Sequence, residues 1–177
     1  MTALSRPVAG DYDPAAEGYI AAAPDIRDAA AALLSQRDAL VELFSSIPES
    51  RAGFSYAPGK WTVREVLGHL SDAERIFTSR LLRIGRGDAT PLPGFDENTY
   101  VPAGAFESRA LADVLAEWTA VRNATVALVK GMPGDAWTRR GTANGTTVTA
   151  GALVYVIVGH TAHHLRVLEE RYGVTPG

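Results

Sequence analysis

Two histidines on one apolar helical face constrain the fold of this chain more than any other feature. Residues 148–172 have the apolar spacing of a long helix, which Gly173 ends. His160 and His164 are one helical turn apart, so their directions differ by only about 40°. They share a stripe with Leu153, Val156, Ile157 and Val167. Both imidazoles are therefore expected inside a helical core, where an unmet polar group costs about 1–3 kcal/mol.

A bound divalent metal would satisfy both rings at once, and this spacing lets two imidazoles converge on one ion. His69, on the flank of another predicted helix, can supply a third nitrogen. Three histidine ligands with open coordination positions are typical of a catalytic metal site. The ligand set suits zinc, nickel, iron or cobalt, with zinc or nickel favoured. His163 points about 60° away from the stripe, so we expect it to support the ligands rather than bind the metal.

The composition is that of one globular domain and excludes several classes of site. The chain has 177 residues, of which 46% are hydrophobic and 21% charged. Its net charge of −3 gives no overall attraction to nucleic acid or anionic lipid. The absence of cysteine excludes disulfides, cysteine nucleophiles and cysteine-bound zinc. No apolar run could span a membrane and residues 1–10 lack a signal-peptide core, so we expect a cytoplasmic protein.

Four long amphipathic segments predict an all-α fold, and they cover residues 24–47, 63–83, 108–130 and 148–172. The second has the clearest start, because Thr62 and Glu65 have the spacing of a capping box. Pro24 fits the first position of the first helix.

The connections between these segments suggest the topology. No stretch has convincing strand alternation, and residues 139–147 have the composition of a Gly- and Thr-rich loop. Residues 87–107 form an unusually long connection. We therefore expect an antiparallel four-helix bundle over residues 24–177, with a long crossover loop between helices 2 and 3. A loose arm, residues 1–23, should precede it.

Two charged residues fall on the apolar stripes of these helices. Glu74 lies on the stripe of the second helix and Arg122 on the stripe of the third. Buried charges are normally paired, because a lone buried charge is very costly. We predict that the two approach each other and help to support the metal ligands. The alternative is that one or both reach solvent at a helix edge.

Several motifs resemble those of the DinB-like superfamily of metal-binding four-helix-bundle proteins. They are KWTVREVLGHL at 60–70, GHTAHHL at 159–165, PLPGFDEN at 91–98 and GTANG at 141–145. The resemblance covers about residues 24–172. It implies a four-helix bundle, often a homodimer, whose metal is held by three histidines, which map onto His69, His160 and His164. It also implies a metal-dependent hydrolase, or a transferase or isomerase that uses an external low-molecular-weight thiol.

The sequence leaves the reaction open, and it identifies no general acid or base. A metalloenzyme acting on a small molecule is the first hypothesis. The alternatives are a non-enzymatic, stress-related bundle that binds a metal or ligand, and a helical interaction module whose histidines bind no metal. Candidate substrate-binding residues are Arg80, Asp96, Glu97, Tyr100 and Arg139, or Arg140 beside it. Each of these is more ordinarily a solvated surface or loop residue.

Overall fold

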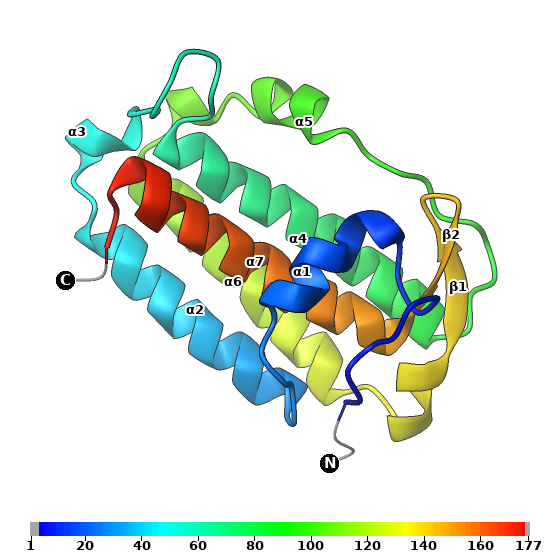
Figure 1. Cartoon of the computed structure of the whole chain (residues 1–177). Coiled ribbons are helices and arrows are strands. Elements are labelled where there is room, and N and C mark those ends of the chain that lie inside the picture. The colour runs from blue at the N-terminus through cyan, green and yellow to red at the C-terminus, as the bar shows by residue number, and fades with distance from the viewer. Residues whose placement is uncertain (1–3, 176–177) are drawn as a thin grey trace.

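Four long helices form a bundle in the computed structural model, which describes residues 4–175 (Figure 1). They are α2 (Ala29–Ser46), α4 (Val63–Gly85), α6 (Leu111–Lys130) and α7 (Ala150–Tyr172). The four-helix bundle predicted from the sequence is confirmed. None of the helices within residues 4–175 is long and apolar enough to cross a bilayer.

Side-chain caps explain where three of these helices begin. The predicted capping box of α4 is confirmed, since Glu65 N donates to Thr62 Oγ1 at 3.2 Å and Thr62 N donates to Glu65 Oε2 at 2.7 Å. Thr149 caps α7, since its side chain accepts a hydrogen bond from Ala152 N. The prediction that the first helix starts at Pro24 is wrong, because Asp28 accepts from Ala31 N and α2 begins after it.

The predicted long crossover joins α4 to α6 and determines their relative direction. It carries a short helix, α5 (Glu97–Ala103), and the 3₁₀ turn η2 (Phe106–Ser108), and it runs back along the bundle (Figure 1). As a result α4 and α6 are parallel: Arg75 pairs with Glu117, and further along Thr78 bonds Thr125. Each of them has an antiparallel neighbour, α7 for α4 and α2 for α6.

A β-hairpin connects α6 to α7, where the sequence predicted only a loop. After the turn η3 (Gly134–Thr138), β1 (Arg140–Ala143) pairs antiparallel with β2 (Thr146–Thr149). The turn residues Asn144 and Gly145 have φ of 52° and 75°. These are the values that a type I′ turn requires and that Asn-Gly readily adopts. Within residues 4–175, the prediction of no strands is therefore wrong for this hairpin alone.

The N-terminal segment packs on the bundle. It contains η1 (Pro14–Ala16) and α1 (Glu17–Ala22), and α1 lies across α7 (Figure 1). Leu4, Tyr12 and Ile20 are buried. The looseness expected for residues 1–23 is therefore not found in residues 4–23, while residues 1–3 lie outside the described range. A short helix, α3 (Glu49–Ala52), follows α2.

Candidate metal centre

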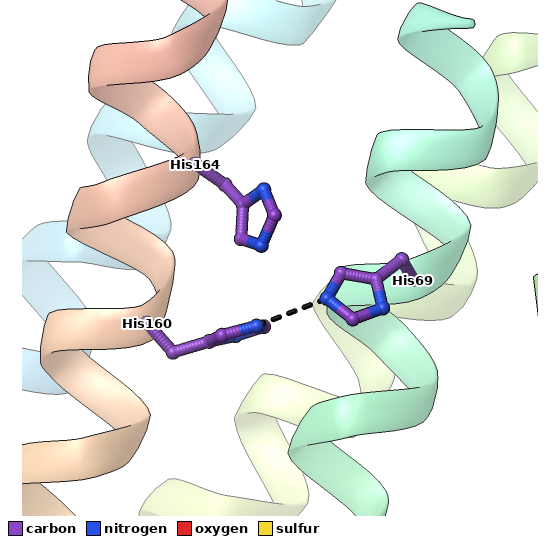
Figure 2. A group of neighbouring side chains, drawn as sticks. All are labelled: His69, His160 and His164. Carbon is purple, nitrogen blue, oxygen red and sulfur yellow. Dashed lines mark hydrogen bonds between the residues drawn. The ribbon is translucent and has the colours of Figure 1, made fainter. Parts of the chain in front are cut away.

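Three histidines from two helices meet between α4 and α7. Figure 2 shows His69 on α4 pointing towards His160 and His164 on α7. One ring nitrogen from each lies within 4.8 Å of the others. The Nε2 atoms of His69 and His160 are 3.0 Å apart. The structure thus brings together the three imidazoles that the sequence singled out, although 91 residues separate His69 from His160.

Aromatic rings enclose this cluster. The Trp61 ring lies 4.7 Å from the His69 ring, and the Phe77 ring lies 5.4 Å from that of His160. Tyr19 of α1 packs edge-on against His160 at 5.1 Å. His69 and His160 are buried, and His164 is half-buried. The imidazoles therefore lie in surroundings that largely exclude water.

The donor chemistry of the three imidazoles fits a metal. Within residues 4–175, the only hydrogen bond on these rings is the one between His69 and His160, so the nitrogens of His164 have no protein partner. Zinc–nitrogen bonds of about 2.0–2.1 Å hold two ligand nitrogens no more than about 4.2 Å apart. Small rotations of the side chains would bring the cluster to that spacing. Residues 4–175 add no fourth histidine or carboxylate to the group.

Burial keeps these imidazoles neutral. It lowers the pKa of His69 to about 4 and that of His164 to about 3. It also lowers the pKa of His160 well below its ordinary value, and the neighbouring histidines add to this effect. Desolvation disfavours the charged imidazolium in each case. At neutral pH the rings therefore keep the free lone pairs that a metal requires.

His163 lies beside the cluster but outside it. Its ring packs 5.1 Å from the ring of His164 and 5.6 Å from that of Tyr19. It is half-buried. Burial and the charge of Arg166 lower its pKa.

The predicted pairing of Glu74 with Arg122 is confirmed. The guanidinium donates to both carboxylate oxygens, at 2.7 and 2.8 Å, and the two side chains are 3% and 0% exposed. Arg122 also donates to Thr161, the residue after His160, at 3.0 Å. The pair does not hydrogen-bond the imidazoles themselves, and its link to the helix that carries His160 and His164 is the bond from Arg122 to Thr161.

A cavity of about 370 Å³ opens beside His160. From the bundle it is lined by Phe77 and Arg80 of α4 and by one face of α7. The remaining walls come from outside the bundle. They include Tyr12, Asp13 and Tyr19 of the N-terminal segment, Phe95 and Glu97 of the crossover, and Asn144 of the hairpin turn.

The candidate substrate-binding residues divide between this cavity and other places. Arg80 and Glu97 line the cavity. Asp96 caps α5, and Tyr100 is exposed and packs against Phe95. Arg139 is not a cavity residue: it donates to the carbonyl of Gly85 at 2.5 Å and to Asp135 at 2.7 Å, which ties the hairpin to the end of α4. Arg140 likewise bonds Asp11 in the N-terminal segment.

Sequence reasoning missed the cavity residues Tyr12, Asp13, Tyr19 and Asn144. A signal for Tyr19 exists in Gly159, a helical glycine directly before His160. A Cβ atom at Gly159 would lie 1.8 Å from the carbonyl oxygen of Tyr19, so only glycine lets α1 approach α7 this closely. The signal for Asn144 is the Asn-Gly hairpin turn.

The DinB superfamily model matches residues 8–168. This chain belongs to the DinB superfamily. The match includes all three clustered histidines and much of the N-terminal segment. No curated protein matches the chain.

Solved structures share the DinB-like fold. YfiT from Bacillus subtilis, described as a probable metal-dependent hydrolase with an unusual four-helix bundle topology, is 20% identical, with a TM-score of 0.69 over 83% of this chain and 87% of that chain. The mycothiol-dependent maleylpyruvate isomerase is 15% identical, with a TM-score of 0.64 over 77% of this chain and 58% of that chain. A mutant of that isomerase is 14% identical, with a TM-score of 0.65 over 83% of this chain and 60% of that chain. At these identities the likeness shows the fold alone.

Proposed function

We propose that this DinB-superfamily protein is a divalent-metal-dependent enzyme in which His69, His160 and His164 hold one zinc or nickel ion. The convergence of three neutral imidazoles within 4.8 Å carries the proposal. Because no fourth protein ligand joins the group within residues 4–175, coordination positions remain for small molecules, as in catalytic sites. When bound, the metal supplies a Lewis acid that makes a water molecule or an external thiol more acidic.

The reaction that this site supports best is hydrolysis of a small molecule held in the adjacent cavity. Glu97 lines that cavity, and its carboxylate has no hydrogen-bond partner within residues 4–175. It is therefore free to accept a proton from an attacking water. Arg80 can bind and orient a negative group of the substrate. Tyr19 and Phe77, which pack against His160, exclude bulk water from the reacting end.

Transfer of an external low-molecular-weight thiol is the second candidate. The chain has no cysteine, so any reacting sulfur must enter from outside. The likeness to an isomerase that depends on mycothiol favours this candidate. We also propose that the protein acts on a small-molecule substrate or ligand and that it forms a homodimer.

A non-enzymatic metal-binding or ligand-binding bundle is a weaker alternative. A purely structural metal is normally closed by four protein ligands. Here three imidazoles lie beside a cavity that also holds Arg80 and Glu97. Open coordination next to a lined cavity favours an enzyme.

Elemental analysis of the purified, untagged protein tests the metal site. We expect about one divalent metal per chain in the parent and loss of most of it in His69→Ala and His160→Ala, because each removes one of three ligands. His163→Ala is the matched control and should keep its metal. Metal-free parent protein, even after zinc or nickel is added back, would refute the site.

Screens of the metal-loaded protein separate the two reactions. Ester hydrolysis that is slowed about 10²–10⁴-fold by Glu97→Gln supports the hydrolase, because that change removes the proton acceptor. Turnover that requires an added thiol supports the transferase.

A further inference from the structure

Arg80 is a cavity cation without a carboxylate partner. Its Nη2 donates to the carbonyl of Pro93 at 2.7 Å, and no Asp or Glu oxygen in residues 4–175 lies within 4.0 Å. Its neighbour Arg83, one turn along α4, pairs with Asp88 at 2.6 Å. Arg80 is also half-buried, and this burial lowers its pKa, while the negative charge of Asp13 acts in the opposite direction. A half-buried guanidinium whose other N–H groups have no acceptor within residues 4–175 can bind an acceptor from outside the chain.

The acidic residues of the cavity limit how much negative charge a ligand can carry. Asp13 accepts from Ala15 N at 3.0 Å and from Asn144 Nδ2 at 3.1 Å, so both of its oxygens are engaged. Glu97 contributes a second negative charge. With one cation and two anions in its walls, the cavity disfavours a doubly charged group such as a phosphate monoester more strongly than a singly charged one. A planar guanidinium can bind either a carboxylate or a phosphate through two parallel hydrogen bonds, so it is the lower charge that favours a single carboxylate here.

The ring of Phe77 lies between this charge and the imidazole of His160. The Arg80 guanidinium carbon is 6.0 Å from the ring centres of both Phe77 and Phe95. The Phe77 ring lies 5.4 Å from the His160 ring, so Phe77 contacts both ends of the cavity. Val156 and Leu153 of α7 line the same space. The apolar surface of the cavity therefore runs from Arg80 along Phe77 to His160.

We infer that the cavity binds a small monocarboxylic acid with an apolar body, whose carboxylate pairs with Arg80 and whose far end faces His160. Binding of this acid does not depend on the proposed function; only its role as the substrate rests on that function. The inference places the reacting bond at the end of the molecule remote from the carboxylate. Binding of the acid itself can be measured whether or not the protein turns it over.

Calorimetric titration of the full chain, with 3-phenylpropanoate as the probe, tests this inference. We expect saturable binding of the acid, and about tenfold to a hundredfold weaker binding of the neutral 3-phenylpropanamide, because the amide loses the charged hydrogen bonds. Phenyl phosphate should bind more weakly than the acid. The titrations are run on zinc-loaded and on metal-depleted protein, with metal content measured on the same samples.

Substitutions at Arg80 separate its charge from the rest of the cavity. Arg80→Met should weaken binding of the acid about tenfold or more and leave that of the amide nearly unchanged. Arg80→Lys should recover part of the loss, because it keeps the positive charge but not the planar guanidinium that forms two parallel hydrogen bonds. Arg86→Met, at an exposed arginine just after α4, is the matched control and should bind like the parent.

Three results would overturn the inference: equal binding of acid and amide, undiminished acid binding by Arg80→Met, or tighter binding of phenyl phosphate. Failure of the proposed function has a different signature, which is parent protein that holds no metal. Acid binding that depends on Arg80 in metal-depleted protein would still support the inference.

Discussion

A single guanidinium, that of Arg122 on α6, binds all three other helices of the bundle. It donates to Glu74 on α4, to Gln36 and the carbonyl of Leu33 on α2, and to Thr161 on α7. The five hydrogen bonds use every N–H group that the side chain has. Because Glu74 lies near His69 in the chain and Thr161 directly follows His160, this one residue links the two helices that carry the imidazoles.

Arg122→Met should therefore destabilise the protein by about 3–5 kcal/mol, because Glu74 would remain buried without its partner. The double variant Glu74→Leu/Arg122→Met should be less destabilised than Arg122→Met alone, since no charge is then left unpaired. Urea unfolding followed by circular dichroism measures both. Arg75→Met, which breaks partly exposed ion pairs with Asp72 on α4 and Glu117 on α6, is the control and should cost no more than about 1 kcal/mol. A double variant as unstable as the single one would contradict this account.

At the level of elements, the contact between α1 and α7 holds Tyr19 in place as one wall of the cavity. The backbone of Tyr19 rests directly on Gly159, which carries no side chain to hold it away. Tyr19 then reaches His160 and His163 with its ring. A helix of six residues has little stability by itself, so packing on α7 must hold α1 in place.

Gly159→Ala should destabilise the protein by a net amount of about 1–3 kcal/mol. Alanine is favoured over glycine within a helix by about 1 kcal/mol. The clash outweighs this gain, because the added carbon would lie 1.8 Å from a backbone oxygen that cannot rotate away. Hydrogen exchange should show faster exchange of the amides of residues 17–22.

Gly18→Ala is the control for this effect. A Cβ atom at Gly18 would meet nothing within 4 Å, so the substitution should leave exchange and stability unchanged or slightly improved. Protection of α1 that is identical in the parent and in Gly159→Ala would show that this contact does not hold the helix.

For the whole molecule, the candidate metal centre exists only when the chain is folded. His69 and His160 are 91 residues apart, and only the antiparallel packing of α4 and α7 brings them within 3.0 Å. A metal held there binds the native state and not the unfolded chain, so it stabilises the entire bundle.

Removal of the metal with a chelator should lower Tm by roughly 5–10 °C. A metal at 100 times its Kd stabilises the folded protein by about 2.7 kcal/mol. Each kcal/mol shifts Tm by about 2–4 °C in a chain of this size. Differential scanning calorimetry with and without the chelator measures the shift. In His69→Ala the chelator should have no effect on Tm. A shift of equal size in that variant would mean that the stabilising metal binds elsewhere.

The bundle and the shared face of His160 and His164 could be predicted from the sequence because both depend on local patterns, and His69 joins them because a bundle lets it face a neighbouring helix. The capping box at Thr62 fixed the start of α4. The spacing of His160 and His164 placed both rings on one buried face. The pairing of Glu74 with Arg122 followed from the cost of leaving either charge buried alone.

The cavity walls could not be predicted in the same way. Residues 4–23 have no apolar periodicity, and they are ordered by contacts with distant residues, such as Tyr19 on Gly159. The crossover reaches the hairpin through backbone hydrogen bonds of Leu92, whose N donates to the carbonyl of Thr142 at 2.9 Å. Neither contact leaves a regular pattern in the local sequence.

The walls of the cavity come from two kinds of segment in the chain, the bundle helices and the segments packed over them, and these can change independently. Phe77, Arg80 and His160 belong to the bundle, where most substitutions disturb packing. Tyr12, Asp13, Phe95, Glu97 and Asn144 belong to segments laid over it. Exchanges in these segments can therefore alter which molecule the cavity accepts while the bundle and its histidines remain as they are. Evolution or design could therefore pair one histidine cluster with many different cavities by changing only the segments laid over the bundle.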